Sequence, residues 1–262
     1  MLGNIFFTLL AGHETTGGTL GFIFLLMAIY PEYQQRMQKE LDGQLGGRPT
    51  SEWTLEKDYA PLEQGYVGAI QKEVLYIFHP ASFIMRKALR PVTLVDSRGQ
   101  PHQIPENTLT LINNAAAARN PRNWDKPKVS AQKSAALSDS PALYFNPGRW
   151  LGAINNSNSS KTKNQDLATW EAFGAGGRLC PGRGFAQVEL TSAMATLFKT
   201  YSLELVVHEN IKRECDGNDK LAWEKTQDNA IKMLYDDIEA NISIGIYKDI
   251  PIRIVKRTDK LA

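Results

Sequence analysis

The stretch Phe173–Gly182, FGAGGRLCPG, places one of the two cysteines of the chain, Cys180, in a glycine-rich loop. Glycine lets a backbone approach a flat ligand closely, and Pro181 suits the first position of a helix. The sulfur would then lie at a helix N-terminus, where the helix dipole and free N–H groups stabilise a thiolate. No second Cys or His stands nearby in the sequence, whereas structural zinc needs four ligands.

Haem iron, in contrast, takes a single protein ligand on one axial face. The stretch resembles the haem-binding signature FxxGxRxCxG of the cytochrome P-450 monooxygenases, which is met at Phe173, Gly176, Arg178, Cys180 and Gly182. The resemblance implies haem b as cofactor, with Cys180 as the axial ligand of its iron. It also implies that Arg178 meets a haem propionate and that Phe173 packs beside the sulfur. The alternative is a buried, inert cysteine in a glycine turn.

Residues 1–30, MLGNIFFTLLAGHETTGGTLGFIFLLMAIY, are apolar except at their centre. They lack the basic region of a signal peptide, and the polar run 13–16 interrupts the apolar pattern. We therefore predict a long helix buried inside a protein, ending before Pro31. The chain begins without a capping residue, so we expect it to be truncated at its front.

The polar run gains a meaning from AGHETT, residues 11–16, because polar groups in a buried helix are costly unless they line a wet cavity or a ligand. AGHETT is similar to the (A/G)Gx(D/E)T pattern of the distal helix in that family, which crosses the haem opposite the cysteine. Ala11 and Gly12 are small enough to lie over the macrocycle. We expect Thr15 to hydrogen-bond the carbonyl of residue 11 and to open the helix locally. By resemblance, Glu14 and Thr15 relay protons.

A zinc site at the same place is excluded by spacing. His13 and Glu14 begin like the zinc-protease motif HExxH, but Gly17 holds the position of the second histidine. We therefore interpret His13 as a packing or hydrogen-bonding residue.

The segment 72–80, KEVLYIFHP, resembles the family helix that carries ExxR, but it departs from the pattern. Glu73 matches the glutamate, whereas Tyr76 stands in place of the arginine. FNPGRW, residues 145–150, resembles a later family segment and supplies Arg149, with Gly148 where an acid is common. We expect Glu73 and Arg149 to neutralise each other and the Tyr76 hydroxyl to donate a hydrogen bond.

The departure at Tyr76 has an energetic consequence. Removing one partner from a buried charged network costs about 3 to 5 kcal/mol. We therefore hypothesise that Tyr76 weakens haem retention or folding. The alternative for Glu73 is an ordinary exposed helical glutamate.

Apolar periodicity and stop signals outline the remaining elements. The predicted helices are 2–29, 32–43, 61–78 and 184–205, and the strand-like runs are 82–89, 92–96, 108–113 and 240–255. Residues 113–169 are predicted to be mostly coil. Arg86, in the first strand-like run, resembles the arginine that the family directs toward a haem propionate, and the alternative is a solvated strand residue.

Composition limits the function classes. The chain has 262 residues, which is long enough for one large domain or two small ones, and its 42% hydrophobic composition is enough for a core. Lys+Arg 30 against Asp+Glu 28 leaves a net charge of +2, which offers no broad field for nucleic acid. Two cysteines, Cys180 and Cys215, form no disulfide framework and favour a reducing compartment.

The resemblance covers residues 1–262 as a single partial domain, mainly α with a small β-sheet (α+β), in a cytochrome P-450-like fold truncated at its N-terminus. It is similar to fungal and microsomal-type members. It implies a monooxygenase that inserts one atom of dioxygen into a small apolar organic substrate, with electrons from an NADPH-dependent flavoprotein reductase. It also implies a place on the cytosolic face of the endoplasmic reticulum membrane, where association would need an N-terminal anchor that these residues lack.

Two alternatives stay open beside the monooxygenase. The first is a truncated, catalytically inactive haem-binding or pseudoenzyme fragment, which the expected truncation and Tyr76 favour. The second is a relative that rearranges peroxides without a reductase. Such relatives often lose the distal acid and threonine, so Glu14 and Thr15 argue against it.

Overall fold

The computed structural model describes residues 1–262 except 119, 121–143, 152–171, 241–242, 247 and 259–262. The described helices are α1 (Leu2–Ile29), α2 (Pro31–Leu45), α3 (Ala60–Gln64), α4 (Tyr66–Ile77), α5 (Asn114–Ala118), α7 (Arg183–Phe198), α8 (Glu209–Glu214) and α9 (Asp219–Asp236). Shorter turns are η1 (Thr50–Glu52), η2 (Leu55–Tyr59), η6 (Pro147–Trp150) and η7 (Gly176–Arg178). Most of the coil predicted for 113–169 lies outside the described residues, but α5 shows that its first part is helical.

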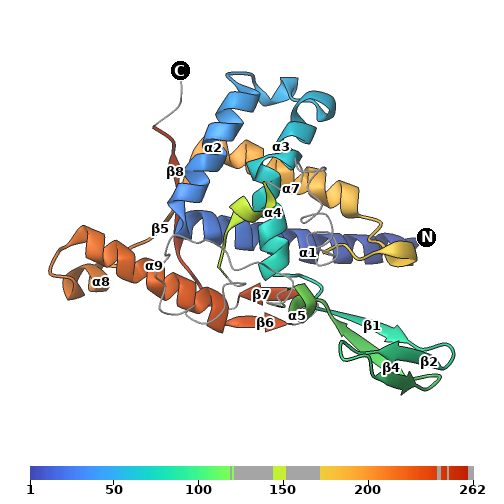
Figure 1. The fold of residues 1–262 in the computed structure, drawn as a ribbon. Helices are drawn as coiled ribbons and strands as arrows, with labels where there is room; N and C mark the ends of the chain where they lie inside the picture. The colour runs from blue at the N-terminus through green and yellow to red at the C-terminus, as the bar shows by residue number, and fades with distance from the viewer. Residues whose placement is uncertain (119, 121–143, 152–171, 241–242, 247, 259–262) are drawn as a thin grey trace.

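The strands form antiparallel pairs of two strands each. The pairs are β1 (Phe83–Lys87) with β4 (Leu109–Asn113), β2 (Val92–Val95) with β3 (Pro101–Ile104), β5 (Tyr201–Leu205) with β8 (Ile252–Lys256), and β6 (Ile238–Ala240) with β7 (Ile244–Ile246). The first two pairs project together from the helical body (Figure 1). The predicted fold class, mainly α with a small amount of β, is confirmed. Strand β3, which begins with a proline, was not predicted.

Helix α1 runs through the molecule (Figure 1). Its two halves differ in burial. The second half supplies core residues such as Ile23, Leu26 and Met27, none of which has any exposed surface. The first half is exposed, with Phe6 and Phe7 each 68% exposed. The prediction of a helix buried along its whole length is therefore wrong for residues 2–14, because none of the described elements covers this half.

The helix predicted at 61–78 is interrupted, and the cause lies in a distant residue. Gly65 separates α3 from α4 with an extended backbone, φ −92° and ψ −152°. The Glu40 carboxylate accepts hydrogen bonds from the backbone N–H groups of Tyr66 and Val67, so it caps the start of α4. A Cβ added at Gly65 would lie 2.4 Å from Glu40 Oε1. The carboxylate thus occupies the space that a side chain would need.

The helix predicted at 184–205 is also shorter than expected. Helix α7 ends at Phe198, and residues 201–205 form β5 instead. Strand β5 is held by its antiparallel partner β8, which lies about fifty residues further on. The Gln34 side chain of α2 also bonds both the backbone N–H and the carbonyl of Leu203. These long-range bonds explain why local periodicity misled the prediction.

The core lies where the second half of α1 meets α2, α4, α7, β5 and α9. Phe22 of α1 stacks on Phe78, which follows α4, with ring centroids 4.4 Å apart. The rings of Phe78 and of Tyr235 on α9 also pack together, with their centroids 5.4 Å apart. Aromatic packing therefore ties three helices together. In the described ranges, no helix is both long and apolar enough to cross a membrane.

Two glycine-to-alanine substitutions test the packing at the start of α4. A Cβ at Gly68 would lie 1.7 Å from the backbone oxygen of Glu63. We therefore expect Gly68→Ala to lower the free energy of unfolding by about 1 to 3 kcal/mol. Gly43 of α2 has open space at its Cβ position, so Gly43→Ala should raise it by about 0.5 to 1 kcal/mol. Urea unfolding measures both, and equal effects of the two changes would contradict the described packing.

Candidate functional site

The cysteine loop is closed by backbone geometry. The Cys180 N–H donates to the Phe173 carbonyl at 2.8 Å. Gly174 and Gly176 have φ values of +72° and +63°, in the left-handed region that favours glycine. Helix α7 begins at Arg183, immediately after the loop, and the Cys180 side chain is partly exposed. The local sequence therefore presents an accessible sulfur just before a helix start.

The other loop residues differ in exposure. A Cβ added at Gly182 would meet Cys180 Sγ at 3.8 Å, which is an ordinary contact distance. Phe173 is partly buried, whereas Arg178 is exposed in η7. The proposed contacts of Phe173 with the sulfur and of Arg178 with a propionate stay predictions.

The polar turn of α1 has the expected hydrogen bond. Thr15 Oγ1 donates to the Ala11 carbonyl at 2.7 Å, and Thr19 Oγ1 donates in the same way to the Thr15 carbonyl at 2.8 Å. Helix α1 is nevertheless continuous from residue 2 to residue 29, so the local opening stays a prediction. Glu14 is exposed next to this turn.

The surface of α1 at this turn is open. Ala11, Gly12 and His13 are exposed, and a Cβ added at Gly12 would meet no atom within 4 Å. The cysteine loop and this half of α1 lie at the same end of the molecule, because α1 and α7 contact each other and begin at the same side (Figure 1). A flat ligand could therefore lie against the small residues of α1.

Glu73 of α4 forms the most enclosed polar cluster near these elements. Its carboxylate has no exposed surface. Arg149 Nε lies 2.9 Å from Oε2, Trp150 Nε1 donates to the same oxygen at 2.7 Å, and the Asn146 N–H donates to Oε1 at 2.6 Å. The structure thus brings Glu73 and Arg149 together, and the alternative of an exposed Glu73 is wrong.

Tyr76 engages Arg149 through its aromatic ring. The guanidinium carbon of Arg149 lies 5.2 Å from the centre of the Tyr76 ring, which is a cation–π distance. The ring also meets Trp150 edge to face, with centroids 6.1 Å apart. Tyr76 is 1% exposed, so these contacts are shielded from water. The hydrogen bond expected from its hydroxyl stays a prediction.

Burial raises the pKa of Glu73 from 4.5 to about 7, although the charge of Arg149 and the bonds from Asn146 and Trp150 oppose this shift. The folded state therefore binds a proton more readily than the unfolded chain. The stability that this carboxyl contributes is fully present below about pH 4.5 and is lost as the pH rises toward 7.

Arg86 lies on β1 and is exposed. Its guanidinium donates to the carbonyl of its neighbour Met85 at 2.9 Å, and its backbone pairs with Thr110 of β4. The structure therefore places Arg86 as a solvated strand residue, and its propionate contact stays a prediction.

Sequence reasoning missed the two donors that complete the Glu73 cluster, Asn146 and Trp150. Asn146 contributes a backbone N–H, which carries no sequence signal. Trp150 directly follows Arg149, and a tryptophan beside a network arginine is the signal that could have identified it. In the described part of the chain, no group of three or more His, Cys, Asp or Glu side chains could hold a metal ion.

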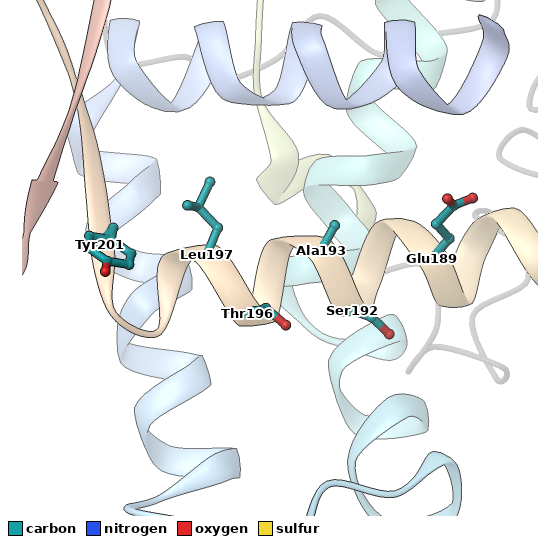
Figure 2. Close-up of a pocket in the computed structure, with 6 residues that line it drawn as sticks. All are labelled: Glu189, Ser192, Ala193, Thr196, Leu197 and Tyr201. Carbon is teal, nitrogen blue, oxygen red and sulfur yellow. The ribbon is translucent and has the colours of Figure 1, made fainter. Parts of the chain in front are cut away.

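A shallow groove lies along α7 and the start of β5 (Figure 2). Its lining residues are Glu189, Ser192, Ala193, Thr196, Leu197 and Tyr201. None of the residues that the sequence pointed to lines it. The groove is therefore separate from the cysteine loop.

The residues present fit a haem with one protein ligand. The cysteine loop offers a single accessible sulfur, and the described residues form no competing metal cluster. A Cβ added at Gly12 of α1 would meet open space. Cys180 would hold the iron, and Ala11 and Gly12 would border the ring.

Comparison with known proteins points to one family. A family model described as Cytochrome P450 matches residues 2–230. A cytochrome P450 monooxygenase of Arthrobotrys oligospora is 25% identical over 98% of this chain and 42% of its own length. Cytochrome P450 monooxygenase 124 of Postia placenta is 27% identical over 78% of this chain and 34% of its own length. Cyclooctat-9-en-7-ol 5-monooxygenase of Streptomyces melanosporofaciens is 29% identical over 79% and 38%. The chain thus spans well under half the length of these relatives.

The pKa of Glu73 predicts a specific pH dependence of stability. Between pH 5 and pH 8 the chain should lose about 2 to 3 kcal/mol of unfolding free energy relative to Glu73→Gln, because only the carboxyl must ionise in a buried place. Urea unfolding of both proteins across this range measures the difference. A difference that stays constant with pH would contradict the assignment.

Proposed function

Because this chain belongs to the cytochrome P450 family, we propose that it forms the haem-thiolate part of a monooxygenase that inserts one atom of dioxygen into a small apolar organic substrate. The observation that carries the proposal is the accessible Cys180 sulfur, held before α7 at the end of the molecule where α1 exposes Ala11 and Gly12. A single sulfur and an open facing helix suit a flat cofactor with one protein ligand.

The residues of the cysteine loop would bind and orient the cofactor. Cys180 would ligate the iron of haem b, and Arg178 and Arg86 would neutralise the propionates. When bound, haem with a thiolate ligand supplies the activation of dioxygen, since the thiolate favours O–O cleavage. Both arginines are exposed, so either can turn toward a carboxylate.

Thr15 and Glu14 would move protons on the other face. In this structure the Thr15 hydroxyl donates a hydrogen bond to the Ala11 carbonyl, so it must turn away from that carbonyl to donate elsewhere. Glu14 is exposed and adjacent in sequence, so it can exchange protons with water. The pair would carry protons from solvent into the site.

Electron supply and location follow the family resemblance. We extend the proposal to an NADPH-dependent flavoprotein reductase as electron donor, and to the cytosolic face of the endoplasmic reticulum membrane as location. The substrate stays at the level of a small apolar organic molecule.

A catalytically inactive haem-binding fragment is the second candidate. The exposed apolar first half of α1 favours it, because a substrate pocket must exclude water and none of the described elements closes this face. Haem bound without turnover of any apolar substrate would support it over the monooxygenase.

The two cysteines allow a matched test of the ligand. The reduced, carbon monoxide-bound spectrum of the haem-loaded chain should show the strongly red-shifted Soret band of thiolate ligation. Cys180→Ser should abolish the band, whereas Cys215→Ser should keep it, because Cys215 is buried in the turn after α8. Failure to bind haem, or a band that survives Cys180→Ser, would sink the proposal.

Tyr76→Arg tests the departure from ExxR. A second guanidinium beside Glu73 should lower the pKa of that carboxyl and strengthen the cluster, so haem content per chain should rise. Tyr76→Phe is the control, because it keeps the ring that faces Arg149. Haem content would be measured after gel filtration, and no gain over the parent would refute the hypothesis that Tyr76 weakens haem retention.

A further inference from the structure

The first turns of α7, which follow the cysteine loop, contribute no buried residue. The buried residues of α7 begin only at Leu190, and Phe185 in the first turns is 75% exposed. The orientation of the first turns of α7 therefore depends on contacts further along the helix. Any residue that fixes the buried part of α7 also fixes where Cys180 lies.

One fixed point lies in the middle of α7. Gln71 of α4, which is 3% exposed, donates to Thr191 Oγ1 at 2.9 Å and contacts Met194 Sδ at 3.7 Å. This bond and the apolar packing around it hold the middle of α7, but apolar packing alone is non-directional and sets the tilt of a helix less sharply than directed bonds do. A second point is needed to define the axis.

The second point is an ion cluster at the far end of α7. Arg257, which follows β8, donates to the carbonyls of Phe198 and Lys199 at 3.3 and 3.4 Å. Its guanidinium binds both carboxylate oxygens of Asp42 on α2, at 2.7 and 3.2 Å, and Lys199 Nζ binds Asp42 at 3.1 Å. The side chains of Arg257 and Asp42 are 2% and 8% exposed. The carbonyls that end α7 are thus tied to α2 by buried, charge-assisted bonds.

We propose that Arg257 is a positioning residue for Cys180, which acts by fixing the tilt of α7. The effect of this positioning on haem ligation rests on the proposed function, whereas the positioning itself does not. Arg183 lies eight residues, or about 12 Å at 1.5 Å per residue, from the fixed point at Thr191, so a tilt of about 5° about that point moves the start of α7 by about 1 Å. A shift of this size would matter for any ligand bond that the sulfur makes.

The bonds made at position 257 require an arginine side chain. The planar guanidinium reaches a carboxylate with two donors and helix carbonyls with the same fork, whereas an ammonium group is a compact point charge. Arg257→Lys therefore keeps the attraction to Asp42 and loses the link to the α7 carbonyls. This separates positioning from charge neutralisation.

The experiment measures the position of Cys180 without haem. Spin labels are attached to Cys180 and to a cysteine at Lys39, an exposed residue of α2, in a Cys215→Ser background. We expect the distance distribution between the labels to shift and broaden in Arg257→Lys and in Arg257→Met. Unchanged distributions in both would overturn the proposal, and Arg257→Lys serves if Arg257→Met does not fold.

Two controls distinguish positioning from general loosening. Labels at Lys39 and Lys232, an exposed residue of α9, should give the same distances with and without Arg257→Lys. Lys72→Met removes the Glu63–Lys72 ion pair, which does not involve α7, and should leave the Cys180 distances unchanged. Equal broadening of both label pairs would overturn the proposal in favour of a purely structural role.

The haem-loaded chain adds a separate readout. Arg257→Lys should lower the fraction of reduced, carbon monoxide-bound protein that shows the red-shifted thiolate band, with Lys72→Met as control. A parent chain without haem would contradict the proposed function and leave the distance result to decide the positioning role. A normal band in Arg257→Lys together with shifted distances would overturn the link between tilt and ligation.

Discussion

Three donors from residues 146–150 converge on the Glu73 carboxylate, which α4 carries into the interior of the molecule. A buried charge without such partners would cost several kcal/mol, so α4 and η6 are stable only together. The Tyr76 ring lies under the Arg149 guanidinium on the other side and adds a cation–π contact. Burial raises the pKa of Glu73 more than these partners lower it, so the pKa is about 7.

Helix α4 also positions both sides of the candidate site. Gln71 holds the middle of α7, whose start carries the cysteine loop. Phe78, just after α4, stacks on Phe22 of α1, less than two helical turns beyond the Thr15 turn. The helices that adjoin Cys180 and carry Thr15, α7 and α1, therefore both contact the segment around Glu73. Weakening the cluster should disturb both sides together.

The sequence predicted what depends on neighbouring residues and missed what depends on distant ones. The signature around Cys180, the Thr15 bond to residue 11 and the end of α1 before Pro31 follow from local rules. The break at Gly65 needs Glu40, and β5 needs β8, so periodicity could not reveal either. The exposure of the first half of α1 depends on what packs against it, which no pattern within the helix encodes.

The proposed function requires that this chain hold haem iron through the sulfur of Cys180. Iron X-ray absorption on the haem-loaded chain tests it most directly, because sulfur and nitrogen neighbours scatter differently. We expect the iron to have one sulfur neighbour in addition to the ring nitrogens. Iron surrounded only by nitrogen or oxygen, in a chain that is folded and loaded, would contradict it.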